Sequence, residues 1–145
     1  MADPLSVAGT AVGVISLAIQ ACQSLAQYYG SWRDAKNNVA TMIASSTALV
    51  SMLKQLRTVL EDDSLEDDIR TEVEENITNV SASLSSLEIE LHKCREANPN
   101  TFRDKISEYG RRLQYPFRET TLLRLRTIVS DMRDNLILAV NILNT

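Results

Sequence analysis

Helix-breaking residues are scarce in this 145-residue chain, which has four glycines and three prolines. Aromatic side chains make up 5% of it. Because turns depend heavily on glycine and proline, these numbers predict a chain built mostly of long helices. No alternating apolar pattern predicts a strand. A hydrophobic content of 44% supplies enough side chains for a core, so one folded domain over residues 1–145 is expected.

Residues that carry catalysis or hold metals are equally sparse. The single histidine, His92, is expected on the solvated flank of a helix. Two carboxylate pairs, Asp62 with Asp63 and Asp67 with Asp68, have no apolar pocket that would raise a pKa for acid catalysis. The chain has no phosphate-binding glycine loop, no HExxH and no cysteine cluster with ligand spacing. The sequence therefore predicts no enzyme, no cofactor and no metal site.

The chain also lacks a surplus of positive charge and any cysteine motif. The formal net charge is −4, which argues against a domain that binds nucleic acid. Cys22 and Cys94 fall on apolar helix stripes without a CxxC motif or a neighbouring histidine. They are expected to be buried thiols of a reduced intracellular chain, and a disulfide between them stays open.

Charge is absent from the first helix that the sequence predicts. No side chain from residue 4 to residue 32 is charged. Asp3 suits the N-cap, Pro4 the first turn and Gly30 the exit, so one helix over residues 3–29 is expected. Residues 5–28 would span roughly 36 Å, against roughly 30 Å of bilayer hydrocarbon.

Three interpretations of this helix are open. It is the central core helix of a bundle, a permanent membrane span, or a helix that leaves a bundle core for a bilayer or for copies of itself. The residues alone favour the core helix. A secretory signal is disfavoured, because Asp3 precedes the apolar run and no basic residue occurs before Arg33. Gly9 and Gly13 lie one turn apart, where a second helix can approach closely.

Four further helices follow from apolar residues at three- and four-residue steps. The expected segments are a helix at 33–60, a helix whose stripe runs over 69–94, a short helix at 102–112 and a helix at 118–143, with a proline joint at 113–117. Together they predict an all-α, up-and-down bundle of four long helices and one short helix. The pattern is still running where the chain stops, which indicates the N-terminal part of a longer protein.

Charges are distributed unevenly along the chain. Residues 61–75 are strongly acidic, while basic side chains gather between residues 95 and 126. Arg111, Arg112 and Arg118 are candidates to contact anionic lipid headgroups, at about 1 kcal/mol each near such a surface. Solvated complementary faces, or salt bridges to the acidic helix, are the favoured alternative on charge alone.

Two stretches of the sequence resemble a known family. They are MADPLSVAGTAVGVISLAIQACQSL, followed by Tyr28, Tyr29 and Trp32, and GRRLQYPFRETTLLRLRTIVSDMRDNLILAV near the end. Both resemble the HeLo-like domain at the N-terminus of fungal STAND proteins of the NLR type. The most specific parts are the small-residue first helix and the RLQYPF joint at 112–117. The resemblance implies a bundle related to the HeLo domain of HET-S and, more distantly, to the four-helix bundle of MLKL.

The resemblance also implies a function. Such domains execute regulated cell death in innate immunity and heterokaryon incompatibility: a C-terminal receptor or amyloid-signalling region drives homo-oligomerisation and membrane permeabilisation. The protein is then cytoplasmic at rest and reaches anionic lipids of the plasma membrane on activation. A non-lytic homotypic or adaptor module is the alternative. Carried over to this chain, the membrane-insertion and oligomerisation residues are Leu5, Gly9, Val12, Gly13, Ile15, Ile19 and Leu25.

Overall fold

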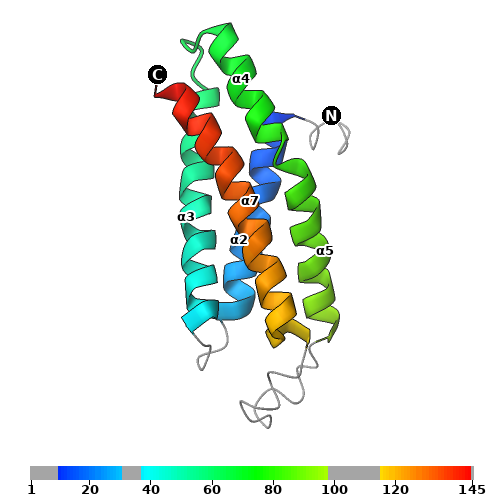
Figure 1. Ribbon diagram of the computed structural model, residues 1–145. Helices are drawn as coiled ribbons and strands as arrows, with labels where there is room; N and C mark the ends of the chain where they lie inside the picture. The colour runs from blue at the N-terminus through cyan, green and yellow to red at the C-terminus, as the bar shows by residue number, and fades with distance from the viewer. Residues whose placement is uncertain (1–9, 31–36, 98–114, 145) are drawn as a thin grey trace.

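The computed structural model describes residues 10–30, 37–97 and 115–144 (Figure 1). The helices in this part of the chain are α2 (Ala11–Gly30), α3 (Asn37–Leu60), α4 (Asp67–Thr78), α5 (Ser81–Ala97), the 3₁₀ turn η2 (Tyr115–Phe117) and α7 (Glu119–Leu143). The described residues contain no strand. The all-α bundle expected from the sequence is confirmed.

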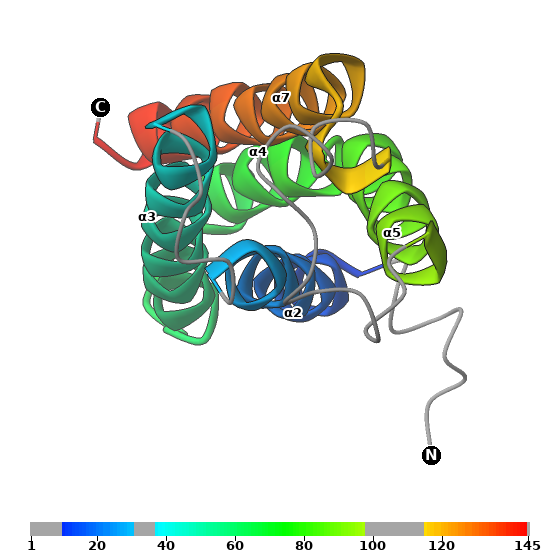
Figure 2. The same ribbon diagram turned by 90° about the horizontal axis from the view of Figure 1, so that it is seen from below.

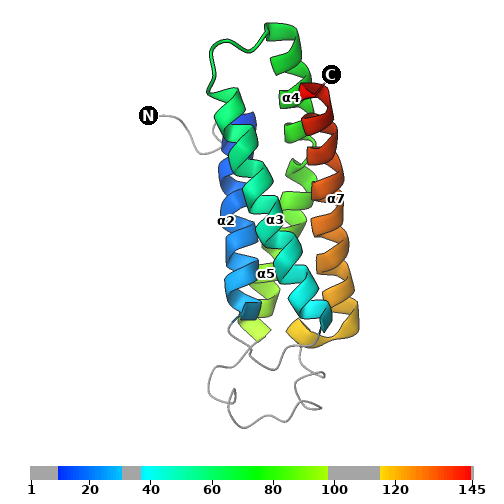
Figure 3. The same ribbon diagram turned by 90° about the vertical axis from the view of Figure 1, so that its left-hand side faces the viewer.

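Four rods surround one core in an up-and-down arrangement. They are α2, α3, the end-to-end pair α4 and α5, and α7; the end-on view shows them around a shared interior (Figure 2). The side view shows α2 against α3, with α7 on the far side of α3 (Figure 3). Helix α2 contacts α3, α4 and α5, so three neighbours cover its apolar side.

Helix α2 begins later than the sequence predicts. The Thr10 hydroxyl accepts a hydrogen bond from the backbone N–H of Gly13 at 2.9 Å, which is the geometry of an N-cap. The helix therefore starts at Ala11, and the predicted start at Asp3 is wrong for α2; residues 1–9 lie outside the described part. Its 20 residues make a rod about 30 Å long.

The third predicted helix is interrupted. Its apolar stripe is buried as expected from Val73 onward, with Ile69 half-buried, but α4 ends at Thr78 and α5 starts at Ser81. At the break the backbone N–H of Val80 donates to the Ile77 carbonyl at 3.0 Å, three residues back instead of four. The Thr78 hydroxyl donates to the Glu75 carbonyl at 2.9 Å, an interaction that favours the end of a helix.

The other predicted boundaries lie close to the observed ones, or outside the described residues. Helix α3 is described from Asn37, and the short helix expected at 102–112 falls in a stretch that is not described. Pro116 is buried in η2, where the chain turns as predicted. Arg118 is the N-cap of α7 instead of its first residue.

The core is continuous along the bundle. It takes buried side chains from every described helix, and the largest fully buried ones are Tyr29, Ile15, Leu25, Met42, Leu49, Leu53, Leu56, Ile77, Leu87, Leu125, Met132 and Leu136. Among the described helices one segment, Val39–Leu60 of α3, is long and apolar enough to cross a membrane by length and composition. This is weak evidence, because a core helix passes the same test.

Candidate functional site

The membrane-insertion residues predicted on α2 mostly face the bundle interior. Ile15 and Leu25 are fully buried, and Gly13 and Ile19 are buried beside them. Val12 departs from the expected apolar stripe, since it is 42% exposed. Leu5 and Gly9 lie outside the described residues.

The outward side of α2 is polar but uncharged. Gln20, Gln23 and Gln27 are exposed, and Ser16 and Ser24 are half-buried. No residue of α2 is acidic or basic. The helix thus presents amides to water and apolar side chains to its neighbours, which is the packing of a core helix in a bundle.

Tyr29 fixes the C-terminal end of α2. Its side chain is fully buried, and its hydroxyl donates a hydrogen bond to the Pro116 carbonyl at 2.7 Å. The same hydroxyl lies 3.6 Å from Sγ of Cys94 on α5. The ring packs edge-on against Tyr28 and Phe117, with centroids 4.9 and 5.7 Å away. One side chain therefore connects α2 to α5 and to η2.

Tyr28 adds a second connection at the same level. Its hydroxyl donates to the Cys94 carbonyl at 3.2 Å, so the two tyrosines hold adjacent positions of α2 against one turn of α5. We call this contact among Tyr28, Tyr29, Cys94 and Pro116 the tyrosine latch. Burial raises the pKa of both the Tyr29 hydroxyl and the Cys94 thiol.

A charged cluster lies next to the tyrosine latch. The Glu90 carboxylate is only 5% exposed and accepts hydrogen bonds from the Tyr115 hydroxyl at 2.6 Å and from Nη1 of Arg124 at 3.0 Å. Nζ of Lys93 is 3.8 Å away. The hydrogen bond to Glu90 raises the pKa of Tyr115, because the carboxylate favours the protonated phenol. The cluster joins α5, η2 and α7.

The two cysteines are free and buried, as the sequence predicts. Burial raises the pKa of the Cys22 thiol to about 12, so the thiol stays protonated and unreactive at neutral pH. Cys94 is held by Tyr29 in the tyrosine latch.

The predicted headgroup contacts are only partly described. Arg111 and Arg112 lie outside the described residues. Arg118 is exposed at the start of α7, with its guanidinium carbon 5.9 Å from the centre of the Tyr115 ring. This arginine is therefore accessible at the end of the bundle where the tyrosine latch lies.

The histidine and the two carboxylate pairs singled out in the sequence lie at exposed positions. His92 is exposed and lies 2.9 Å from Glu96. Asp62 accepts hydrogen bonds from the backbone and hydroxyl of Ser64, which lower its pKa, the direction opposite to that of a general acid. The described residues contain no group of three or more His, Cys, Asp or Glu side chains that could hold a metal ion.

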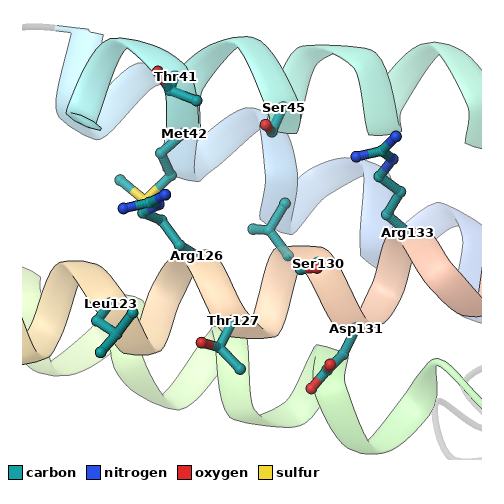
Figure 4. A pocket seen from close by; sticks show the side chains of 10 residues that line it. Thr41, Met42, Ser45, Leu123, Arg126, Thr127, Ser130, Asp131 and Arg133 are labelled. Carbon is teal, nitrogen blue, oxygen red and sulfur yellow. The ribbon is translucent and has the colours of Figure 1, made fainter. Parts of the chain in front are cut away.

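A groove lined by both polar and apolar side chains runs between α3 and α7. It encloses about 360 Å³, and its lining residues are Thr41, Met42, Ser45, Leu123, Arg126, Thr127, Val129, Ser130, Asp131 and Arg133. Figure 4 shows Arg126 and Arg133 reaching toward α3 at the two ends of the groove, with Ser45 between them on the facing helix, while Asp131 points away. We call this feature the α3–α7 groove.

Sequence reasoning did not find the tyrosine latch, the Glu90 cluster or the α3–α7 groove. The Tyr29 partners are 65 and 87 residues away, which no local pattern reveals. Glu90 gave a signal that could have been used, since it lies three residues from Leu87 and one from Leu91 on a buried stripe. A carboxylate in such a place needs partners on a neighbouring element.

The fold defines an all-helical bundle domain. The sites found among its described residues are contacts between helices, some apolar and some polar. The family model for the pigment biosynthesis cluster protein PigL N-terminal region matches residues 2–136, so the chain belongs to the PigL N-terminal family. The azaphilone pigments biosynthesis cluster protein L of Monascus ruber is 28% identical over 125 residues, which cover 84% of this chain. The match spans 26% of that relative's length. No solved structure matches the chain.

Proposed function

We propose that this domain is a HeLo-like cell-death execution module that oligomerises and permeabilises membranes by releasing α2 from the bundle. The observation that supports it is the character of α2, a 20-residue helix without a single charge whose apolar side packs against α3, α4 and α5. The proposed partners are further copies of the chain, anionic lipids on activation, and a receptor or amyloid-signalling region beyond residue 145. The protein moves from cytoplasm to plasma membrane.

The energetics of α2 allow two environments. Its apolar side chains lose contact with water in the bundle, and a bilayer would remove the same surface from water at a similar free energy. The length of about 30 Å matches the hydrocarbon thickness. By length and composition the α3 segment meets the criterion for a membrane span and α2 does not. Helix α3 carries Lys54 and Arg57, however, whereas α2 carries no charge, so α2 has the lower charge cost in lipid.

The tyrosine latch is the barrier to release in this proposal. Tyr28 and Tyr29 hold the last turn of α2 on α5 and η2, so α2 leaves only when these contacts open. Clustering of many copies raises the local concentration and favours shared insertion. Gly13 on α2, together with Gly9 outside the described residues, would then provide close helix–helix contact in the membrane.

Dye leakage from vesicles containing phosphatidylserine tests the proposal. Gln20→Glu adds a charge on the exposed side of α2, where the bundle tolerates it but a bilayer does not. Gln55→Glu makes the same change at an exposed position of α3 and is the matched control. We expect wild type and Gln55→Glu to release dye, and Gln20→Glu to release at least about tenfold less.

Equal leakage by Gln20→Glu and wild type would refute membrane insertion of α2. Two further variants test the same mechanism, with circular dichroism as the check on folding. Ile15→Glu changes the buried side of α2, and the pair Gly9→Leu with Gly13→Leu removes the two glycines. Leakage that none of these changes affects would remove the mechanism.

An adaptor module is the second candidate. The α3–α7 groove favours it, because a groove flanked by two arginines can bind a partner without any change in α2. A synthetic peptide of residues 5–29 separates the two functions. An execution domain predicts that the peptide binds anionic vesicles by itself, whereas an adaptor predicts no binding.

A further inference from the structure

The α3–α7 groove presents two positive charges at a fixed spacing. Arg126 and Arg133 are exposed and seven residues apart on α7, which is two helical turns or about 10.5 Å. In the described part of the chain, no carboxylate lies within ion-pair distance of either guanidinium. The floor between them carries the hydroxyls of Ser45 and Ser130. The groove therefore suits a ligand with two anionic groups about two turns apart.

The outer face of α4 has the complementary pattern. Asp68, Glu72 and Glu75 are exposed and follow each other at four- and three-residue steps, so they lie on one side of the helix. Asp68 and Glu75 are also seven residues apart, and no described basic group pairs with either. Arg70, the basic residue of α4, donates to the carbonyls of Leu60 and Asp62.

The two surfaces of one chain do not meet. Val73 and Ile77 anchor the opposite side of α4 in the core, so its acidic face points outward. In Figure 1, α4 lies along the C-terminal half of α7, whereas the residues of α7 that line the groove, between Leu123 and Arg133, belong to its N-terminal half and middle. Among the described residues, no acidic helix of the same chain lies over the groove, so an acidic helix that binds there comes from another molecule.

We propose that the α3–α7 groove of one copy binds the outer face of α4 of a second copy, with Arg126 and Arg133 paired to Asp68 and Glu75. This inference rests on the proposed function and deepens it, because it names the contact through which copies assemble. The contact is heterologous: each bound pair leaves one groove and one acidic helix unoccupied, so the assembly grows by adding further copies until it closes. Because the pairs are solvent-exposed, the assembly weakens with salt.

Sedimentation velocity of the 145-residue chain, without lipid, tests the contact. Wild type should self-associate with rising concentration at low salt and less so at high salt. Arg126→Glu with Arg133→Glu makes the groove acidic, and Asp68→Arg with Glu75→Arg makes α4 basic. Each double variant alone should associate about tenfold more weakly or worse, because two attractions become two repulsions.

Mixing the two double variants gives the sharpest result. The acidic groove of the Arg126→Glu, Arg133→Glu variant then binds the basic α4 of the Asp68→Arg, Glu75→Arg variant. The basic groove of the second variant binds the acidic α4 of the first, as in wild type. Equimolar mixing should therefore restore assembly. Lys54→Glu with Arg95→Glu, at exposed positions on α3 and α5, makes the same change in net charge as the groove variant and should associate as wild type does.

Three outcomes would overturn the proposal: a wild-type chain that stays monomeric at low salt, a double variant that associates like wild type, or a mixture that stays dissociated while circular dichroism shows both variants folded. If the groove variant loses binding to phosphatidylserine vesicles while its self-association is unchanged, the groove binds headgroups and the proposal also fails. Assembly without dye leakage would instead refute only the membrane role.

Discussion

The substitution Tyr29→Phe isolates the polar part of the tyrosine latch. It keeps the buried ring against Tyr28 and Phe117 and removes the hydroxyl, which donates to the Pro116 carbonyl at 2.7 Å. The buried carbonyl then loses this donor, and the thiol of Cys94, 3.6 Å from the hydroxyl, loses the same partner. Loss of a buried hydrogen bond of this kind lowers the free energy of unfolding by about 1–2 kcal/mol.

Thermal and urea unfolding measure the effect. A chain of 145 residues has an unfolding entropy of about 0.3 kcal/mol/K at the midpoint, so the expected fall in Tm is about 3–7 °C. Tyr28→Phe is the graded comparison: its hydroxyl donates at the longer distance of 3.2 Å from a half-buried position, so it should cost less. A Tyr29→Phe loss below about 0.5 kcal/mol would refute the latch as a stabilising contact.

Hydrogen exchange then tests whether the latch acts on α2 in particular. Tyr29→Phe should speed amide exchange in the last turns of α2 more than in the middle of α3, because the latch holds that end of α2 directly. If protection falls equally in both helices, the hydroxyl contributes to global stability and does not control release of α2.

Three further changes test other parts of the interior. Glu90→Gln should lower the free energy of unfolding by about 1 kcal/mol in urea titration. It should also bring the pKa of Tyr115 down toward its ordinary value in an NMR titration, and an unchanged pKa of Tyr115 would contradict its hydrogen bond to Glu90. Ser46→Ala should raise the free energy of unfolding by about 1 kcal/mol, and with it the Tm, since this fully buried hydroxyl has no hydrogen-bond partner among the described residues; a lower Tm would contradict this. Burial raises the pKa of Cys22 from 9.0 to about 12, so the stability that the protonated thiol contributes is complete below pH 9 and is lost as pH rises toward 12. Cys22→Ala should therefore make the fall in the free energy of unfolding above pH 9 shallower by up to about 1.4 kcal/mol per pH unit. An equal slope in both proteins would show that Cys22 does not cause the fall.

Local periodicity predicted the packing of most of the chain. The stripe through Ile15 and Ile19 identified the buried side of α2, and the stripe ending at Cys94 identified that of α4 and α5. Both depend on side chains a few residues apart, which the 3.6-residue period places on one face whatever the neighbours are. Val12 is the exception, because no described neighbour covers that part of α2 and it remains 42% exposed.

The boundaries were harder to predict, since single hydrogen bonds decide them. The Thr10 cap starts α2 eight residues after the predicted Asp3, although Asp3 and Pro4 are a good helix start by composition. Thr78 and Asn79 interrupt a stripe that continues across them without a phase change. Periodicity cannot distinguish one long helix from two that follow each other end to end.

The sequence by itself determined the class of fold. A chain with few turn residues forms long helices, which satisfy their own backbone groups, and helices with repeated apolar stripes bury those stripes by packing together as a bundle. Tertiary structure alone decided the sites. The tyrosine latch, the Glu90 cluster and the α3–α7 groove join residues of different helices, many positions apart in the chain. Their geometry depends on how the rods are rotated and offset, and packing between helices sets both quantities.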